Sequence, residues 1–365
     1  MKTLKIKDIC DKGSSALKQK DVEGQEGKYP VYGASGYISS IDTYHQDKDY
    51  IAIVKDGSGI GRVTFMPAYS SVIGTMQYIL PKEGYNIKYI SYCLQSLDLA
   101  KYKQGAAIPH IYFRDYGERY VNIEESLPEQ ERIVSLLDAE FAKIDAIKAN
   151  AEKQLQDAKA LFQSALKDLL TPKEGWKEKR FGMIYDVRDG THDSPKYQEE
   201  GFPLVTSKNL KGGKIDFSNI KYISEIDYQK INERSKVDIG DVLFAMIGTI
   251  GNPVLVTEEP FYAIKNMALF KVPCNQSGKY LQYLLSSNKI LDKFHNDAKG
   301  TTQKFVGLGY LRNFSFPMPE YTEQLEIIEK IKTFEIKITK LQVNYEQTVT
   351  LCNDLKQSIL KDIFG

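Results

Sequence analysis

The sequence predicts an α+β fold in which two duplicated, mixed α/β domains are separated by two long helices that pair as an antiparallel coiled coil. Three observations predict it: an uneven distribution of tyrosine, a repeat that spans about half the chain, and two heptad patterns of apolar residues. The 365 residues are enough for two or three domains of roughly 100–200 residues. A content of 42% hydrophobic and 27% charged residues is typical of a globular protein and excludes a largely disordered chain.

Tyrosine divides the chain into four parts. Residues 1–126 hold 14 of the 24 tyrosines and residues 176–320 hold eight, whereas residues 127–175 hold none and residues 321–365 hold two. Short apolar runs separated by glycine-rich turns indicate strands in both tyrosine-rich blocks. Both blocks are therefore expected to be mixed α/β domains.

The repeat relates the two halves at an offset of 194 residues. Residues 164–170 (SALKDLL) match residues 358–364 (SILKDIF), and Glu129-Gln130 matches Glu323-Gln324. Upstream, Gly105-Ala106-Ala107-Ile108-Pro109 parallels the segment that begins at Gly300, and Gly59-Ile60-Gly61 aligns loosely with Thr249-Ile250-Gly251. A repeat this long indicates a duplicated module made of a domain and a helix.

Each copy of the module ends in a predicted long helix, at 127–172 and 321–365. Apolar residues recur there at alternating spacings of four and three, which is the seam of a coiled coil. The helix-pairing residues are expected to be Ile133, Leu137, Ile144, Ile147, Ala151, Leu155, Ile327, Ile331, Phe334, Ile338, Leu341, Tyr345, Leu355 and Ile359.

Helix length favours pairing over the alternative that each helix packs only on its own domain. A helix of 35–40 residues is roughly 55–60 Å long, which exceeds the diameter of a small domain. One domain cannot cover such a seam, so the two helices are expected to cover each other. The domains would then occupy residues 1–126 and 173–320.

Composition excludes several classes of protein. Four scattered cysteines and four scattered histidines, none in a paired motif, argue against a disulfide scaffold and a metal site. The N-terminus lacks a signal-peptide pattern and no apolar run is long enough to cross a bilayer, so a cytoplasmic protein is expected.

No catalytic motif is visible in the sequence. There is no GxxxxGK[ST] phosphate loop, no Asn/Asp-Pro-Pro-Tyr/Phe motif of adenine methyltransferases, and no GxSxG or HExxH signature. The segment from Asp56 to Gly61 lacks dinucleotide-loop spacing and is better explained as a hairpin turn. We therefore expect no catalytic residue in this chain.

Polar loops recur at matching places in the two blocks and favour binding. Side chains of Gln, Asn, Arg and Lys read base edges in the major groove, and hydroxyls and lysines hold phosphates. For any single residue an ordinary surface loop is the competing explanation. The DNA-binding candidates are Lys55, Ser58, Arg62, His110, Tyr112, Arg114, Ser207, Lys208, Asn209, Thr301, Thr302, Gln303 and Lys304.

The duplicated motif resembles that of the specificity (DNA-recognition) subunits of type I restriction–modification systems. A hydrophobic strand, a proline, a Glu-Gln pair and a long helix occur in this order twice, around residues 127–133 and 319–327. Gly300-Thr301-Thr302-Gln303 and Trp176-Lys177 also look like that family. The resemblance covers the whole chain, although the first copy has Ala106-Ala107-Ile108-Pro109 where the second has Thr-Thr-Gln-Lys.

The resemblance implies two target recognition domains that each read half of a bipartite, asymmetric DNA site, with the helices setting the distance between the halves. It implies as partners double-stranded DNA, two methyltransferase subunits that carry S-adenosylmethionine, and motor-nuclease restriction subunits, with no role for a membrane. The chain itself would bind no cofactor and no metal, and would be the non-catalytic specificity subunit of a DNA adenine methyltransferase and restriction complex.

The net charge is compatible with this reading and with two alternatives. The total is only +1, but residues 1–126 and 176–320 carry +1 and +3 while the helical segments are negative. A weakly charged chain fits a reader whose partners hold most of the DNA backbone. The alternatives are a non-DNA coiled-coil adaptor whose globular blocks bind protein or carbohydrate, and a stand-alone enzyme.

Overall fold

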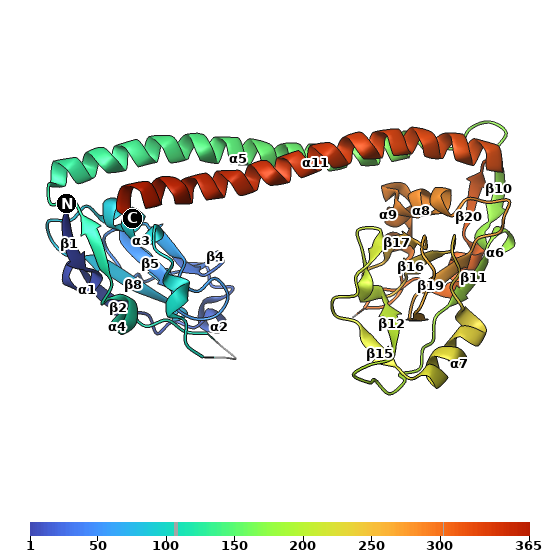
Figure 1. Ribbon diagram of the computed structural model, residues 1–365, viewed down its shortest axis with the longest axis horizontal. Helices are drawn as coiled ribbons and strands as arrows, with labels where there is room; N and C mark the ends of the chain where they lie inside the picture. The colour runs from blue at the N-terminus through green and yellow to red at the C-terminus, as the bar shows by residue number, and fades with distance from the viewer. Residues whose placement is uncertain (106–108, 302) are drawn as a thin grey trace. The chain divides into compact units, whose positions relative to one another are not determined.

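The structure is a computed structural model, which describes residues 1–105, 109–301 and 303–365. It contains two compact units (Figure 1). Unit 1 comprises Met1–Lys153 and Tyr345–Gly365, and unit 2 comprises Gln154–Asn344. The long helices α5 (Leu127–Leu169) and α11 (Tyr321–Phe364) each contribute one part to either unit. The predicted α+β fold class, with two long helices, is confirmed.

Unit 1 is built on a four-stranded antiparallel sheet of order β2-β8-β5-β6. A three-stranded sheet β4-β3-β7, in which β3 and β7 are parallel, and a β1-β9 pair complete it. Its strands are β1 (Lys2–Lys5), β2 (Cys10–Ser14), β3 (Tyr29–Gly33), β4 (Gly36–Ile41), β5 (Tyr50–Val54), β6 (Val63–Met66), β7 (Ser71–Val72), β8 (Met76–Pro81) and β9 (Tyr120–Ile123). Its short helices are α1 (Ile6–Ile9), α2 (Gln19–Val22), α3 (Ile87–Gln95), η1 (Leu99–Tyr102) and α4 (Phe113–Tyr116).

Unit 2 repeats this plan. The sheet β11-β19-β16-β17 corresponds to β2-β8-β5-β6, the sheet β15-β12-β18 keeps one parallel pair, and β10-β20 corresponds to β1-β9. Its strands are β10 (Lys177–Arg180), β11 (Asp186–Asp189), β12 (Phe202–Thr206), β13 (Leu210–Lys211), β14 (Lys214–Ile215), β15 (Lys221–Ile223), β16 (Val242–Ala245), β17 (Gly251–Leu255), β18 (Ala263–Lys265), β19 (Ala268–Lys271) and β20 (Ser315–Met318). Its shorter helices are α6 (Phe181–Ile184), η2 (Ser207–Asn209), α7 (Glu225–Ser235), α8 (Gly278–Ser286), α9 (Asn288–Asp297) and α10 (Leu308–Asn313). The structural duplication confirms the repeat found in the sequence.

The repeated glutamine has a structural role in both units. Gln130 is fully buried, accepts a hydrogen bond from Asn86 N at 2.7 Å and donates to Glu124 O at 2.7 Å. Gln324 is equally buried and accepts from Ser277 N at 3.0 Å while donating to Pro319 O at 3.1 Å. Asn86 and Ser277 are the N-caps of α3 and α8, so each glutamine fastens a domain helix to the start of a long helix.

In unit 1 the two long helices run antiparallel. Lys356 Nζ donates to Asp145 Oδ1 at 2.6 Å and Lys148 Nζ donates to Asn353 Oδ1 at 3.0 Å, so residue numbers rise on one helix as they fall on the other. The cluster of buried apolar residues that includes Leu137 also contains Leu360. Pairing therefore completes the core of this unit.

In unit 2 the long helices share a core with the domain. Leu166 and Ile327 belong to one cluster of buried residues with Phe181 of α6 and Leu281 of α8. Trp176 Nε1 donates to Glu323 Oε2 at 2.9 Å, which ties the chain after α5 to the start of α11.

The residues expected to pair the helices differ in how far their side chains are buried. Buried members are Ile133, Leu137, Ile144, Ala151, Ile327, Ile331 and Ile338. Half-buried members are Leu155, Tyr345 and Ile359. The exposed members are Ile147 (54% exposed), Phe334 (43%), Leu341 (38%) and Leu355 (51%).

The positions beside these exposed apolar residues are occupied by polar or amphipathic side chains that are more buried. On α11 the half-buried residues Glu335, Gln342 and Lys356 each lie one position after an exposed apolar residue. Glu335 accepts a hydrogen bond from Tyr283 Oη at 2.5 Å, and Lys356 Nζ lies 5.0 Å from the centre of the Phe141 ring. Long charged side chains bury their stems and keep the charge in a polar contact, so apolar content alone does not define the buried face of a helix.

Candidate nucleic-acid interface

Two loops meet at one end of the four-stranded sheet in each unit. The hairpin loop follows the central strand and comprises residues 55–62 in unit 1 and 246–250 in unit 2. The facing loop comprises residues 104–110 in unit 1 and 299–305 in unit 2. The structure describes these loops except for residues 106–108 and 302. These two loops carry most of the DNA-binding candidates.

The same backbone contact joins the loops in both units. Gly57 N donates to Pro109 O at 3.2 Å, and Gly248 N donates to Lys304 O at 2.9 Å. Both glycines have positive φ, 81° and 76°, which a residue with a Cβ atom adopts only with strain. The recurrence of this contact makes Pro109 the structural counterpart of Lys304.

In unit 1 a row of stacked side chains extends from the facing loop. His110 Nδ1 lies 2.6 Å from Asp56 Oδ1, and the His110 ring stacks on Tyr112 with 6.4 Å between centroids. The Arg114 guanidinium lies 4.7 Å from the centre of the Tyr112 ring. The structure thus brings three predicted residues together and shows how Asp56 orients the first of them.

The other candidates of unit 1 lie in the hairpin loop. Lys55 is half-buried, with Nζ 3.9 Å from Asp56 Oδ2, whereas Ser58 and Arg62 are exposed. Arg62 Nη2 lies 2.4 Å from where a Cβ of Gly59 would be, so the loop glycine leaves room for the guanidinium. Exposed cations on such a loop are suited to phosphate contact.

In unit 2 four predicted residues line one groove of about 470 Å³. These are Ser207, Lys208, Asn209 and Gln303. Lys208 and Gln303 are exposed, as are Thr301 and Lys304 in the same facing loop. The predicted residue Thr302 lies outside the described residues.

Two of these four side chains are committed to the local fold. Asn209 is buried, its Oδ1 accepts from Thr206 N and Oγ1 at 2.9 Å, and its Nδ2 donates to Asp216 O at 3.0 Å. Ser207 Oγ donates to Asn266 O at 2.9 Å. The structure thus gives Asn209 a role in capping η2, and its contact with DNA stays a prediction.

The groove also contains residues that the sequence did not single out. Tyr197, Lys221 and Asn266 line it, and Lys221 Nζ lies 4.6 Å from the centre of the Tyr197 ring. Among the described residues, neither Lys208 nor Lys221 has a carboxylate within 4 Å, whereas Lys211 pairs with Asp216 at 2.6 Å. The polar run from Gly190 to Ser194 directly follows β11 and is a sequence signal for a loop at this end of the sheet.

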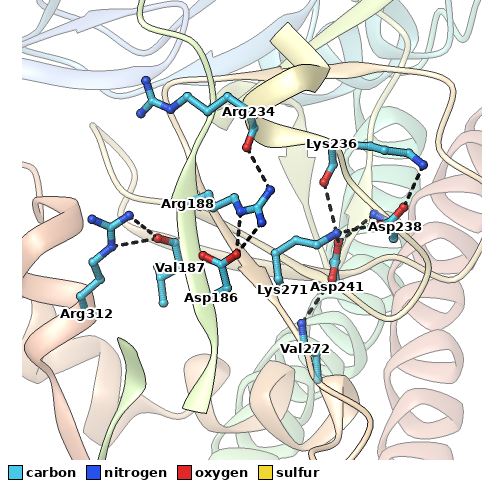
Figure 2. Close-up of polar contacts among 10 residues, drawn as sticks. All are labelled: Asp186, Val187, Arg188, Arg234, Lys236, Asp238, Asp241, Lys271, Val272 and Arg312. Carbon is cyan, nitrogen blue, oxygen red and sulfur yellow. Dashed lines mark hydrogen bonds and ion pairs between the residues drawn. The ribbon is translucent and has the colours of Figure 1, made fainter. Parts of the chain in front are cut away.

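A network of polar contacts joins β11, β19 and the end of α7 in unit 2 (Figure 2). Lys271 Nζ lies 2.5 Å from both Asp238 Oδ2 and Asp241 Oδ2. The hydrogen bond from Lys271, opposed by partial burial, holds the pKa of Asp238 below its usual value. Arg188 donates to Arg234 O at 3.1 Å, which fixes the end of α7 against β11.

Two classes of site are missing from the described part of the chain. Across residues 1–105, 109–301 and 303–365, no three His, Cys, Asp or Glu side chains are grouped so that they could hold a metal ion. No helix in the same ranges is both long and apolar enough to cross a membrane.

Comparison with known proteins points to one family. The chain is 26% identical over 273 residues to the Type I restriction enzyme EcoBI specificity subunit of Escherichia coli, covering 65% of this chain and 56% of that protein. It is 22% identical over 315 residues to the MjaVIII specificity subunit of Methanocaldococcus jannaschii, covering 78% of this chain and 72% of that protein. The chain thus spans little more than half the length of the E. coli relative.

A solved structure has a similar fold over nearly the whole chain. A chain from a structure of complex assembly and conformational transition of the type I R-M system superposes with a TM-score of 0.71 at 16% identity, covering 98% of this chain and 96% of that one. The family model for the type I restriction modification DNA specificity domain matches residues 1–157 and 173–349. Because that model accounts for most of the sequence in two segments, the chain belongs to the family of type I restriction modification DNA specificity domain proteins.

Proposed function

We propose that this chain is the DNA sequence-recognition subunit of a type I restriction–modification complex and reads a bipartite, asymmetric site. The observation that carries the proposal is the duplication: two units of one topology each present polar, glycine-jointed loops at the same end of their sheets. Residues 1–126 and 173–320 would be the two target recognition domains. Each would read one half of the site in double-stranded DNA.

The loop chemistry supports contact with DNA in both units. Unit 1 offers His110, Tyr112 and Arg114, and unit 2 offers Lys208 and Gln303 in a groove. Cationic side chains and hydroxyls bind phosphates, whereas arginine and amide side chains also read base edges in the major groove. The different chemistry of the two units accounts for an asymmetric site.

The long helices support docking of partner subunits. Large apolar side chains remain exposed along them, and we infer that they contribute to a docking surface. On α5 they include Leu136, Ile147 and Leu161, and on α11 they include Phe334, Ile336, Leu341, Val343, Leu351 and Leu355. Two methyltransferase subunits would dock here and supply S-adenosylmethionine and the catalytic residues, and motor-nuclease subunits would join for restriction. This chain would be non-catalytic and bind no cofactor itself.

Methylome sequencing of cells that express the chain with its methyltransferase subunits tests the proposal. We expect 6-methyladenine in both halves of one bipartite motif, and no such motif from the methyltransferase subunits alone. Gln303→Ala should relax one half only, because each unit has its own core and its own loops. A wild-type complex that leaves no bipartite motif contradicts the function, and equal relaxation of both halves contradicts the two-unit reading. The non-DNA adaptor gains no support from the family match.

A further inference from the structure

We propose that Lys221 of unit 2, held against the ring of Tyr197, binds a phosphate of the DNA backbone. This inference rests on the function proposed above and assigns one contact within it. Lys221 is the first residue of β15, and both residues line the groove of about 470 Å³ that also contains Lys208 and Gln303.

The groove carries positive charge that the composition of the whole chain conceals. Among the described residues, three lysines and one aspartate line it, whereas the chain as a whole has a net charge of +1. Lys211 Nζ lies 2.6 Å from Asp216 Oδ2, so the carboxylate of Asp216 is already paired. In the part of the chain that the structure describes, no carboxylate lies within 4 Å of the ammonium of Lys208 or Lys221. These two cations are therefore left for an anion from outside, and DNA supplies one at every phosphate.

Tyr197 gives the ammonium of Lys221 a defined position. Lys221 Nζ lies 4.6 Å from the centre of the Tyr197 ring, within the range in which a cation is attracted to the face of an aromatic ring. The loop that carries this ring is fastened to β15, because Gln198 N donates to Tyr222 O at 2.9 Å. Tyr197 is 43% exposed and Lys221 is also exposed, so DNA can reach the pair. A lysine that is held in place before binding loses less side-chain freedom when it contacts a phosphate.

The two kinds of DNA contact come from different elements of the groove. Gln303 belongs to the facing loop, whereas Lys221 belongs to β15, which is an edge strand of the three-stranded sheet β15-β12-β18. Amide side chains read base edges, and lysines are common ligands of phosphate oxygens. Because the phosphates border the base edges in the major groove, a groove that reads a base from one element meets the backbone at another.

The corresponding position of unit 1 has different chemistry. Residues 202–204 of β12 correspond to residues 29–31 of β3, since both strands pair in the same register with a neighbour on either side. The third of these residues lies opposite Lys221 in β15 and opposite Ser39 in β4. Ser39 is buried, whereas Lys221 is exposed. This contact therefore belongs to unit 2 alone.

The test uses the full chain in complex with its methyltransferase subunits, bound to the motif that methylome sequencing defines. Each backbone phosphate of the duplex is replaced in turn by a neutral methylphosphonate, and the affinity is measured. For the wild-type chain, we expect one such replacement to weaken binding in the half-site that Gln303→Ala relaxes. For Lys221→Ala, the same replacement should have no further effect, while replacements elsewhere should keep theirs.

Salt dependence gives a second measure of the same contact. Each phosphate contact contributes about 0.9 to the slope of log affinity against log salt concentration. A rise in salt of about fourfold should therefore weaken the wild-type complex by roughly 3-fold more than the Lys221→Ala complex. The affinity lost in Lys221→Ala at low salt should be the same for the motif and for duplexes with single base-pair changes, because a phosphate carries no sequence information.

Conservative variants separate positioning from structure. Lys221→Arg keeps the cation, and Tyr197→Phe keeps the ring, so both should retain the wild-type salt dependence, whereas Tyr197→Leu should reduce it. Lys289→Ala is the matched control, since Lys289 is an exposed lysine of α9 that lies 6.0 Å from the centre of the Phe316 ring. Lys289 lies outside the groove, and Figure 1 shows α9 well apart from β15 within unit 2. Its replacement should change neither the affinity nor the salt dependence.

Three results overturn the inference: an unchanged salt dependence in Lys221→Ala, a loss of affinity confined to changes at one base pair, or a methylphosphonate profile that Lys221→Ala leaves unaltered. A Tyr197→Phe complex as weak as Tyr197→Leu contradicts the role of the ring. Failure of the proposed function looks different, because then the wild-type complex itself yields no bipartite motif. Co-elution of each variant with the methyltransferase subunits checks that the complex is assembled.

Discussion

At the scale of single residues, two buried glutamines explain why a short motif recurs 194 residues apart. An amide side chain that is buried must satisfy its own hydrogen bonds, and Gln130 and Gln324 do so with backbone groups of two elements each. The donor is the N-cap residue of a domain helix, and the acceptor lies just before a long helix. The motif is thus a joint between domain and helix.

Replacing either glutamine by alanine should weaken one unit. Gln130→Ala leaves the Asn86 N–H and the Glu124 carbonyl without these partners, and we expect a loss of about 1–3 kcal/mol in unfolding free energy. Gln324→Ala should act likewise on unit 2. Gln156→Ala, at an exposed position of α5, is the control and should stay within about 0.5 kcal/mol. Chemical denaturation measures the free energy of unfolding, and hydrogen exchange shows which unit is affected. Equal effects of Gln130→Ala and Gln156→Ala would contradict the role of Gln130 in joining the domain to the long helix.

At the scale of elements, α5 and α11 follow a heptad pattern, and polar residues contribute to their buried faces. Lys148 occupies the position next to exposed Ile147 and reaches Asn353 across the helix pair. Glu335 binds Tyr283 and Asp138 binds Tyr92 Oη at 2.5 Å, so each domain packs a tyrosine against an acid of a long helix. Contact with the domain therefore helps to decide which helix face is buried.

Alanine substitutions on α5 should distinguish the buried face from the exposed one. Leu137→Ala removes a side chain that is 1% exposed and should cost about 2–5 kcal/mol in unfolding free energy. Ile147→Ala, at 54% exposed, should change it by less than about 0.5 kcal/mol. Thermal and denaturant unfolding provide the values. Similar costs for the two variants would place Ile147 in the seam after all.

At the scale of the whole molecule, each unit is assembled from distant parts of the chain. Unit 1 needs residues 345–365 because Cys352, Leu360 and Phe364 belong to its core. The Phe364 ring lies 5.1 Å from that of Tyr89 of α3. The core of unit 1 therefore combines side chains from both ends of the sequence.

Ending the chain at Asn344 should affect the two units unequally. The truncation removes three side chains from the core of unit 1 and none from unit 2, which ends at that residue. We expect hydrogen exchange to accelerate across residues 1–153 and to stay near its original rate across 154–344. Limited proteolysis should then cut unit 1 first. Equal loss of protection in both units would show that the two cores are coupled.

The sequence by itself determined the duplication, the two long helices and the family, because a repeat and a heptad rhythm are local patterns that survive without a known fold. It also placed Gln303 and His110 on loops and Lys208 directly after a strand, since polar residues after a strand mark its end. Only the tertiary structure decided which of those loop residues are free to bind. Asn209 caps η2, while His192 and Asn266, 74 residues apart, meet through a hydrogen bond. Whether a side chain reads a ligand or holds a loop depends on which partners the fold brings to it, and those partners are distant in the sequence.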